Sequence, residues 1–333
     1  MQTILVTGGG GYIGSHAVKR LLKKGNTIIA FDNFSHGWRE PLEILKKYGT
    51  LHVFEGDLTK KKDLIKLFKK YKIDSVMHFA ALCSVDESMK KPELYFNNNV
   101  LGTANLLETM RQFGVKKIIF SSTCAVYGNT EHLPIDEKHQ TKPENPYGES
   151  KLKAEKEIER FDREHGLAYV ILRYFNVCGA DSDGEIGDSK KPSELLVQNA
   201  VRGALGIEDF KLTYRKVDTP DGTPIRDYVD VEDLIEAHLS ALSYLEQGKP
   251  PQIFNLGNGK GWSVREIIEA VKKELGVEFA VNKGEERKGE YSAVYADITK
   301  AKAVLRFNPK KTLADSVKSL AKWYNKKPNG YEK

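Results

Sequence analysis

The sequence predicts an α/β protein in which a doubly wound parallel sheet is followed by a smaller α/β domain. Short runs of β-branched apolar residues alternate with amphipathic stretches through the first half, which is typical of a parallel sheet covered by helices. The 333 residues are enough for about two domains of roughly 150 residues each. Apolar residues make up 40% and charged residues 29%, so a wholly disordered chain is excluded.

The parallel sheet is expected to contain six strands, each a short run rich in β-branched residues. They are Thr3–Thr7, Thr27–Phe31, Leu51–Glu55, Ser75–Phe79, Lys117–Ser121 and Ala168–Arg173. A helix from about Tyr12 to Lys24 connects the first two strands and ends at Gly25, after two lysines that suit the negative end of the helix dipole. These elements predict a βαβ unit at the start of the chain.

The sequence changes character after Gly179. A polar loop from Asp181 to Lys191 is followed by mixed helices and short strands, which end in a helix around Leu313–Tyr324. We therefore expect a first domain at residues 1–179 and a second, substrate-binding domain mainly at 180–333, with some of the chain crossing back and a cleft between the two.

Charge, hydropathy and cysteine content exclude several classes of protein. The net charge is +6, but no basic block is long enough for a nucleic-acid-binding arm. No apolar run reaches the ~20 residues that cross a bilayer, and the N-terminus lacks a signal-peptide pattern, so we expect a cytoplasmic protein. Cys83, Cys124 and Cys178 are far apart, and their spacing predicts neither disulfides nor a metal site.

The segment from residue 7 to residue 15 reads TGGGGYIGS and places glycines at positions 8, 11 and 14, between a strand and a helix. Glycines let the backbone approach a pyrophosphate, and a helix N-terminus offers it free N–H groups. Asp32 closes the second strand and can accept hydrogen bonds from a ribose diol, whereas it would repel a 2′-phosphate. Alone, the loop could be a simple strand-to-helix turn; with Asp32 it indicates a Rossmann-type site for NAD rather than NADP.

Three further segments are candidates to complete this pocket. They are Asp57-Leu58 after the third strand, Phe79-Ala80-Ala81 at the end of the fourth, and Asn97–Val100 at the start of the next helix. Small residues at the end of a strand permit close approach of a cofactor, and amides both donate and accept hydrogen bonds. Each segment alone also has a structural explanation, because asparagines cap helices and alanines fill cores.

A second motif predicts catalytic side chains on a helix. Asn145 is a suitable N-cap and Pro146 a suitable first helical residue, so Tyr147 and Lys151 lie on one helix face, about 6 Å apart along the axis. The lysine cation and a positively charged nicotinamide would lower the pKa of the tyrosine from about 10 towards neutrality. Tyr147 could then accept a proton.

This tyrosine and lysine could also be chance neighbours on a surface helix. Two hydroxyl residues strengthen the catalytic interpretation, because Ser122 and Thr123 follow the fifth strand. A hydroxyl at that place could hydrogen-bond both a substrate oxygen and the phenol of Tyr147.

Taken together, these motifs resemble the extended short-chain dehydrogenase/reductases, and within them the UDP-glucose 4-epimerase family. The resemblance runs through nearly the whole chain, with the motifs in the family's order. It is carried by the glycine loop, Asp32-Asn33, His78–Ala81, Asn97–Val100, Phe120–Thr123, Pro146–Lys151, Leu172–Asn176, Asp221–Thr223 and Arg226–Tyr228.

The resemblance implies an isomerase that interconverts UDP-glucose and UDP-galactose with NAD and no external reductant. Tyr147 would take the proton of the sugar 4-hydroxyl while hydride moves from C4 to NAD, giving a 4-keto sugar. Hydride and proton would return after the sugar turns its other face. Thr123 would orient the hydroxyl, and Lys151 would bind the nicotinamide ribose and tune Tyr147.

The resemblance also implies two sets of binding residues, no metal, and a homodimer through the helices after Asn97 and Tyr147. The cofactor would contact Gly8, Gly11, Tyr12, Ile13, Gly14, Asp32, Asn33, Asp57, Leu58, Phe79, Ala80, Ala81, Asn98, Ser121, Ser122, Tyr147, Lys151 and Tyr174. The UDP-sugar would contact Thr123, Tyr147, Tyr174, Phe175, Asn176, Tyr214, Arg226, Arg287, Glu290 and Val294. Arginine forks suit phosphates, although Arg226 could instead pair with Asp227 or Asp230, and Arg287 could be a solvated charge.

The chain departs from the family pattern at several positions. Leu195–Gln198 and Thr213–Arg215 replace segments that lie against the nucleotide in many relatives, Glu290 replaces an aspartate, and Cys83 replaces a lysine near the cofactor. Val294 stands where a large aromatic residue would exclude N-acetyl groups, so the resemblance implies that UDP-N-acetylhexosamines are accepted too.

Three alternatives use the same motifs. Dehydration needs an acid and a base, usually an Asp-Glu pair after the threonine, and Cys124 and Ala125 stand there instead. Decarboxylation of UDP-glucuronate, or another oxidation of a nucleotide sugar at C4, stays open. A non-catalytic NAD-binding regulator has no need of the set formed by Thr123, Tyr147 and Lys151.

Overall fold

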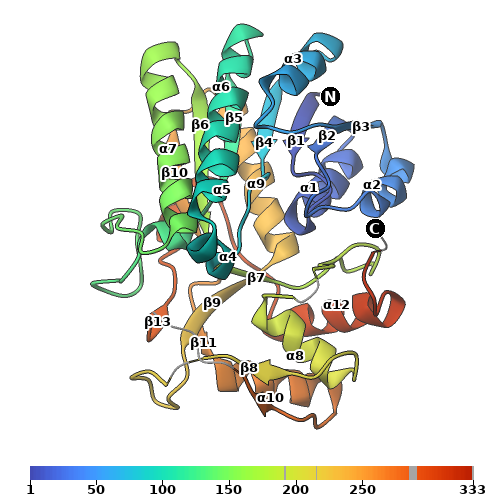
Figure 1. Cartoon of the computed structure of the whole chain (residues 1–333), viewed down its shortest axis with the longest axis vertical. Coiled ribbons are helices and arrows are strands. Elements are labelled where there is room, and N and C mark those ends of the chain that lie inside the picture. Colours follow the sequence, from blue (N-terminus) through green and yellow to red (C-terminus); the bar gives the residue numbers. More distant parts are fainter. Residues whose placement is uncertain (191–192, 215, 285–290, 332–333) are drawn as a thin grey trace. The chain divides into compact units, whose positions relative to one another are not determined.

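The computed structural model describes residues 1–190, 193–214, 216–284 and 291–331 (Figure 1). The chain divides into two compact units. Unit 1 comprises Met1–Asn129, Lys138–Tyr174 and Ala237–Phe254, and unit 2 comprises Thr130–Glu137, Phe175–Glu236 and Asn255–Lys333. The units thus differ from the expected ranges 1–179 and 180–333: unit 1 ends its main part at Tyr174 and regains a late segment.

Unit 1 is built on a seven-stranded sheet with the order β10-β6-β5-β4-β1-β2-β3, and the pairs from β6 to β3 are parallel. The strands are β1 (Thr3–Thr7), β2 (Thr27–Asp32), β3 (Leu51–Glu55), β4 (Ser75–His78), β5 (Lys117–Thr123), β6 (Ala168–Tyr174) and β10 (Gln252–Leu256). All six predicted strands are therefore confirmed, although β5 runs to Thr123, so that Ser122 and Thr123 lie inside the strand rather than after it.

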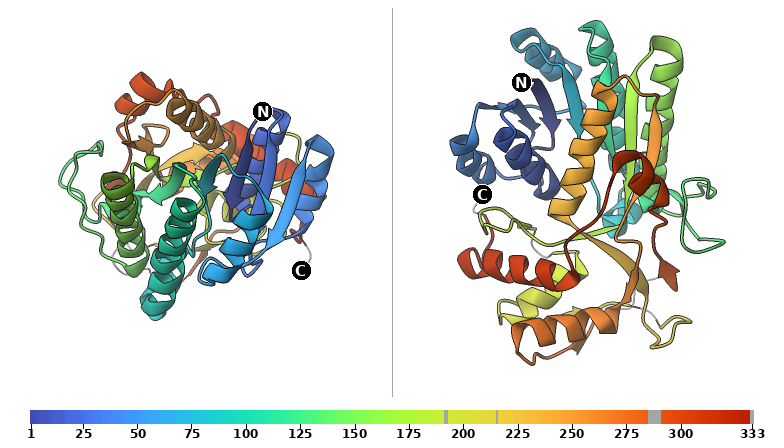
Figure 2. Two further views of the ribbon diagram at one scale, coloured as in Figure 1. Left: turned by 90° about the horizontal axis from the view of Figure 1, so that it is seen from above. Right: turned by 180° about the vertical axis from the view of Figure 1, so that it is seen from behind.

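Helices cover the two faces of this sheet (Figures 1 and 2). They are α1 (Tyr12–Lys23), α2 (Glu40–Leu45), α3 (Lys61–Lys70), α4 (Val85–Lys90), α5 (Pro92–Tyr95), α6 (Gly102–Gln112) and α7 (Pro146–His165), with α9 (Val231–Glu246) passing from unit 2 into unit 1. Short 3-10 turns η1 (Lys46–Tyr48) and η3 (Cys124–Val126) and the π-helix η2 (Phe96–Leu101) complete the set. Apolar residues of α3, α6 and α7 form one core with the strands.

The local signals in the sequence explain where the important helices begin and end. The Asn145 side chain accepts a hydrogen bond from Gly148 N (2.8 Å) and Pro146 is the first residue of α7, as predicted. The first helix, α1, ends at Lys23, one residue before the prediction, and Gly25 follows with φ +79°.

Unit 2 is a smaller α/β unit. Its strands are β7 (Asn176–Cys178), β8 (Lys211–Leu212), β9 (Ile225–Asp230), β11 (Gly261–Ser263), β12 (Asn282–Lys283) and β13 (Ala293–Val294). Strand β9 pairs with β11, β13 and β7, while β12 pairs with β8. The helices are α8 (Leu196–Ala204), α10 (Val264–Leu275), α11 (Thr299–Leu305) and α12 (Leu313–Lys326), the last being the predicted C-terminal helix with two further residues. The predicted fold class is confirmed.

Within the described part of the chain, none of the helices combines the length and the apolar character that a membrane span requires.

Candidate active site

The glycine loop brings the end of β1 against the end of β4 in unit 1. Gly8 has φ +71°, and a Cβ atom there would lie 2.7 Å from Ala80 N. A Cβ atom on Gly14 would lie 2.1 Å from Gly8 O. Both positions therefore require glycine, because any side chain would push the loop away from the helix or from Ala80. The structure brings these three predicted residues together.

The start of α1 and the end of β2 form a setting that fits a dinucleotide. The first turn of α1 has no acidic residue, and Tyr12 and Ile13 at its start are partly exposed. Asp32 is buried, and its carboxylate accepts hydrogen bonds from Gly10 N (2.9 Å) and Phe34 N (2.8 Å). A carboxylate has about four acceptor positions, so Asp32 retains capacity for ribose hydroxyls.

Burial and local hydrogen bonds set the pKa values of two carboxylates at the same edge of the sheet, Asp32 and Asp57. Burial raises the pKa of Asp32, against the opposing effect of the backbone N–H groups. Burial acts in the same direction on Asp57, but hydrogen bonds from Thr59 and Asn33 outweigh it and lower the pKa of Asp57. Asn33 and Asp57 are thus neighbours, as a shared pocket requires, whereas the Leu58 side chain belongs to the core.

The asparagine segment forms the π-helix η2 rather than the start of an α-helix. Asn98 Nδ2 donates to Asn99 Oδ1 (2.9 Å), and the buried Asn99 donates to Leu82 O (3.0 Å) and to Ser150 Oγ on α7 (2.9 Å). Asn99 therefore ties η2 to α7, and π-helical turns are frequent at functional sites. The contact of Asn98 with the cofactor stays a prediction.

Thr123, Tyr147 and Lys151 come together in unit 1. A side-chain hydrogen bond joins Thr123, the last residue of β5, to the partly buried Tyr147. Lys151 is 3% exposed, and its Nζ lies 4.3 Å from the centroid of the Phe120 ring. Tyr147 and Lys151, one turn apart on α7, both interact electrostatically with Cys83, and Tyr147 bonds the hydroxyl at the carboxyl end of β5.

The pKa of Tyr147 differs from the sequence-based expectation. Burial raises it well above 10, Cys83 and Tyr174 act in the same direction, and the Thr123 hydrogen bond only partly opposes them. Burial also lowers the pKa of Lys151 to about 8. In the polypeptide itself burial therefore keeps the phenol protonated. The expected lowering includes the positive charge of a bound nicotinamide, and for the protein with its cofactor it stays a prediction.

The serines of β5 face protein groups. Ser121 Oγ and His238 Nε2 share a hydrogen bond (3.1 Å), and Ser121 also bonds Tyr174. The hydroxyl of Ser122 is fully buried and donates to the Glu155 carboxylate. Successive strand residues point to opposite faces, so Ser122 points away from the side of Thr123, contrary to the expectation that it reaches the substrate.

Sequence reasoning missed two buried polar side chains beside these residues, Glu155 and His238. It also missed the hydrogen bonds of His78, which is buried as well. His78 hydrogen-bonds Thr7 Oγ1 (2.6 Å) and Thr103 Oγ1 (3.0 Å), and burial lowers its pKa to about 3. It is therefore neutral and connects β4 to β1 and α6. The ring of Phe79, a predicted cofactor contact, lies 4.8 Å from that of His238.

Unit 2 gathers four of the predicted substrate residues in β9, in the strands that pair with it, or directly before one of them. Asn176 is the register partner of Tyr228, Val294 is the partner of Arg226, and the buried Phe175 precedes Asn176. Arg226 Nη1 donates to the carbonyl oxygens of Ile225 and Tyr291, both at 2.9 Å.

The acidic neighbours that could have bound Arg226 have other partners. Asp227 accepts hydrogen bonds from the backbone N–H groups of Asn258, Gly259 and Ala296. Asp230 accepts a hydrogen bond from the side-chain hydroxyl of Ser316. Arg287 and Glu290 lie outside the described residues.

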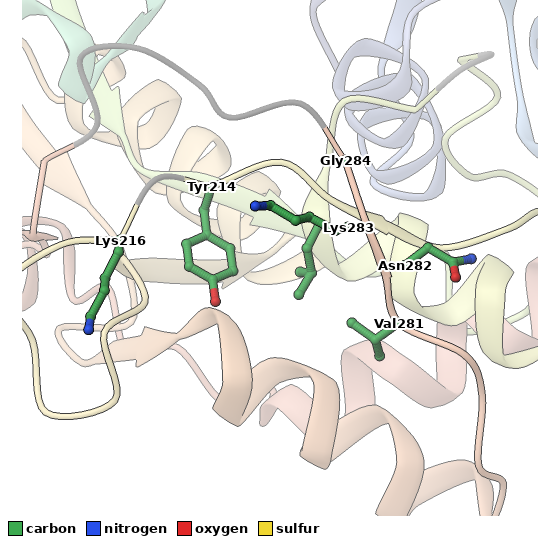
Figure 3. Close-up of a pocket in the computed structure, with 7 residues that line it drawn as sticks. Tyr214, Lys216, Val281, Asn282, Lys283 and Gly284 are labelled. Atoms are coloured by element: carbon green, nitrogen blue, oxygen red, sulfur yellow. The ribbon is translucent and has the colours of Figure 1, made fainter.

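Tyr214 lines an open pocket with a volume of about 320 Å³ in unit 2 (Figure 3). Its lining comes from β8, β12 and the adjoining segments and consists of Leu212, Tyr214, Lys216, Val281, Asn282, Lys283 and Gly284. The ring of Tyr214 stands between the side chains of Lys216 and Lys283 in Figure 3. Two ammonium groups beside an aromatic ring suit a ligand that is both anionic and aromatic.

Comparison with known proteins gives one consistent result. The model of the NAD dependent epimerase/dehydratase family matches residues 4–257. UDP-glucose 4-epimerase of Lactobacillus helveticus is 42% identical over 331 residues, which cover 99% of each chain. Putative UDP-arabinose 4-epimerase 2 of Arabidopsis thaliana is 42% identical over 98% of this chain and 81% of its own length.

Solved structures agree with these relatives. UDP-glucose 4-epimerase from Bifidobacterium longum in complex with NAD+ and UDP matches with a TM-score of 0.94 and 36% identity, over 99% of this chain and 100% of that one. The UDP-Glc/GlcNAc 4-epimerase of Campylobacter jejuni matches with a TM-score of 0.85 and 39% identity, over 98% and 100% of the two chains.

Proposed function

Because this chain belongs to the NAD dependent epimerase/dehydratase family, we propose that it is a UDP-sugar 4-epimerase that uses NAD to interconvert UDP-glucose and UDP-galactose. The observation that carries the proposal is the cluster of Thr123, Tyr147 and Lys151 in the same unit as the glycine loop. A protein that only bound NAD would have no use for a phenol that is hydrogen-bonded to a neighbouring hydroxyl and held one turn from a buried lysine.

The residues of unit 1 would hold NAD at the glycine loop, Asp32, Asn33, Asp57 and Ala80. Bound NAD supplies a reversible acceptor for the hydride on C4 of the sugar. The positive charges of Lys151 and of bound nicotinamide would favour the phenolate form of Tyr147. As a phenolate, Tyr147 would take the proton of the 4-hydroxyl and later return it, while Thr123 would hold the hydroxyl oxygen beside it. Lys151, with a pKa of about 8, is mostly charged at neutral pH, so it offers positive charge near a phenol that the protein alone keeps protonated.

Inversion requires that the sugar present both faces of C4 to the same groups. The UDP portion must then be held firmly while the hexose turns. We assign the diphosphate to Asn176 and Arg226, and the base to the pocket lined by Tyr214, whose ring can stack on it. Arg287 and Glu290 remain proposed contacts of the nucleotide on the strength of the resemblance alone.

The sugar specificity rests on Val294. Its small side chain is buried at the register position of Arg226, and an aromatic ring there would occupy more space. We propose that UDP-N-acetylglucosamine is converted as well, as the name of the Campylobacter jejuni relative says of that protein. A Val294→Tyr variant should lose this activity and keep the one on UDP-galactose. Failure of the unmodified protein to convert UDP-N-acetylglucosamine, while it converts UDP-galactose, would exclude the broader specificity.

A homodimer through unit 1 is also proposed. Val85, Met89, Leu94 and Leu101 are between 42% and 61% exposed, and they lie on α4, α5 and η2, which all contact α7. Exposed apolar residues grouped in this way mark protein interfaces. Sedimentation should show a dimer that Met89→Lys together with Leu94→Lys converts to a monomer, whereas Val304→Lys on α11 leaves it intact. A monomeric unmodified protein would contradict this proposal.

The decisive assay adds UDP-galactose to the purified protein without external cofactor and measures UDP-glucose. In parallel reactions, UDP-arabinose tests for pentose epimerase activity and UDP-glucuronate tests for decarboxylase activity. Conversion of UDP-glucuronate with release of carbon dioxide, and no conversion of UDP-galactose, would replace the proposal with a decarboxylase.

A further inference from the structure

A buried ion pair in unit 1 lies next to the proposed catalytic residues. Glu155 on α7 is 1% exposed and Arg173 on β6 is 4% exposed. Arg173 Nη2 donates to Glu155 Oε2 (2.6 Å) and Arg173 Nε to Oε1 (3.0 Å), which is a two-point fork. The same carboxylate accepts the hydroxyl of Ser122, and Arg173 Nη1 donates to the Tyr127 hydroxyl (3.1 Å).

The position of this pair relates directly to the active site. Glu155 lies one helical turn after Lys151 and about two turns after Tyr147 on α7. Ser122 and Arg173 are register partners on β5 and β6, and the next pair in the register is Thr123 and Tyr174. One carboxylate therefore fastens the catalytic helix to two strands, one residue before Thr123.

Stability alone is a poor explanation for such a pair. Removing two charges from water costs free energy that their attraction often fails to recover, so an apolar pair of similar volume would serve a core at least as well. Directional hydrogen bonds, in contrast, fix the relative place of the groups that make them. The hydrogen bonds of Glu155 to Arg173 on β6 and Ser122 on β5 therefore fix the position of α7 relative to these two strands.

We propose that Glu155 and Arg173 are positioning residues, whose ion pair holds Tyr147 and Lys151 in register with Thr123 for proton transfer. The inference rests on the proposed function of the site. It concerns how the chain arranges the phenol, the ammonium group and the hydroxyl, and it assigns no contact of Glu155 or Arg173 with substrate or cofactor.

The surroundings of Lys151 supply a second consequence. Among the described residues, the titratable groups that interact electrostatically with it include His78 on β4, Cys83 after β4 and Glu155 on α7, and Tyr147 lies one turn before it on α7. His78 is neutral, while Cys83 and Glu155 both raise the pKa of Lys151 against the lowering by burial. Replacement of Glu155 by a neutral residue should therefore make the ammonium group easier to deprotonate.

The kinetic test uses Glu155→Gln and Arg173→Met in the full chain, with UDP-galactose as substrate. Each variant should lose about a hundredfold in kcat, as expected for a misplaced catalytic group, with KM and retained NAD unchanged. Each single variant leaves one buried charge without its partner, so its thermal midpoint should fall. The double variant Glu155→Leu with Arg173→Met replaces the pair by apolar side chains, so its thermal midpoint should be higher than those of the single variants while kcat stays low. Recovery of kcat together with the midpoint, or a Glu155→Gln variant with unchanged kcat, would overturn the proposal.

A control and a second readout separate this inference from the proposed function. Arg202→Met breaks an ion pair in unit 2 between the buried Arg202 and the exposed Glu208, and it should lower the thermal midpoint without lowering kcat. The titration of Lys151 can be followed by NMR of ¹³C-labelled lysine side chains, with the signal assigned by its loss in Lys151→Met. Its midpoint should be lower in Glu155→Gln; an unchanged midpoint would overturn the proposal. Absence of turnover in the unmodified protein would contradict the proposed function instead, and would leave this titration as the test of the arrangement.

Discussion

Replacement of Asp230 by asparagine should change how the stability of the protein depends on pH. Asp230 ends β9 in unit 2, is 3% exposed, and accepts hydrogen bonds from Glu232 N (2.9 Å) and Ser316 Oγ (2.6 Å). Burial raises the pKa of Asp230 from 3.8 to about 7, and the nearby Glu232 and Asp233 act in the same direction. The folded protein therefore keeps a proton on this carboxyl at pH values where the unfolded chain has lost it.

The size of the effect follows from this difference in pKa. The carboxyl contributes most to stability below its unfolded pKa, and the contribution is lost as pH rises to about 7. Each pH unit in that range costs about 1.4 kcal/mol, so this group should lower the free energy of unfolding by about 3 kcal/mol between pH 5 and pH 8. Asparagine has no proton to lose, and its amide can accept from Glu232 N and donate to Ser316 Oγ. Relative to the unmodified protein, Asp230→Asn should gain about 3 kcal/mol over this range.

Urea unfolding of both proteins at pH 5 and pH 8 measures this gain. Asp297→Asn serves as the control, because hydrogen bonds from Thr299 lower the pKa of Asp297 and keep it ionised over the whole range. Its effect on stability should be the same at both pH values. The reasoning from burial would be refuted if the difference in free energy of unfolding between Asp230→Asn and the unmodified protein were the same at pH 5 and pH 8. Asp230 would then be ionised in the folded state at both pH values.

Three further substitutions test the site. Tyr147→Phe removes the proton carrier, so turnover of UDP-galactose should fall by about 10⁴-fold. The amount of bound NAD, measured after its release from the protein, should not change. Tyr244→Phe, which loses only a hydrogen bond to Pro250 O, is the control. Gly14→Ala would place a methyl carbon 2.1 Å from Gly8 O, so the loop must shift and calorimetry should show a large loss of NAD affinity. Asp32→Asn removes the charge that repels a 2′-phosphate, so the ratio of NADP to NAD affinity should rise about tenfold, which corresponds to roughly 1.4 kcal/mol.

Each of these outcomes can fail separately. Turnover by Tyr147→Phe close to that of the control would remove the phenol from the mechanism. Unchanged NAD affinity in Gly14→Ala would show that the tight packing of the loop is not needed for the cofactor. An unchanged ratio of NADP to NAD affinity in Asp32→Asn would contradict the assignment of this carboxylate to the ribose.

The parts of the structure that local rules decide could be predicted from the sequence. The cap at Asn145, the proline at position 146 and the glycine at 25 act within one helical turn, and the helices begin and end accordingly. Strands β1 and β3 have the predicted bounds: β1 is a compact apolar run, whereas β3 mixes apolar and polar residues and is followed by Gly56. The glycines at 8 and 14 were recognisable because their spacing has a steric cause.

The parts that depend on distant residues could not be predicted. Strand β10 joins the sheet beside β6 from late in the chain, and no local pattern shows that pairing. The direction of the Ser122 hydroxyl depends on where β5 ends, and the pKa of Tyr147 depends on how deeply α7 buries it. Glu155 has the sequence context of an ordinary helical glutamate, and only the register of β5 with β6 reveals its partners.

The central claim is that hydride leaves C4 of the sugar and returns to the same carbon within one active site. UDP-galactose labelled with deuterium at C4 tests it most directly, with purified protein, no added cofactor and ordinary water. The account predicts UDP-glucose that retains the deuterium at C4, because the label never exchanges with solvent. Product that has lost the label to water would contradict it.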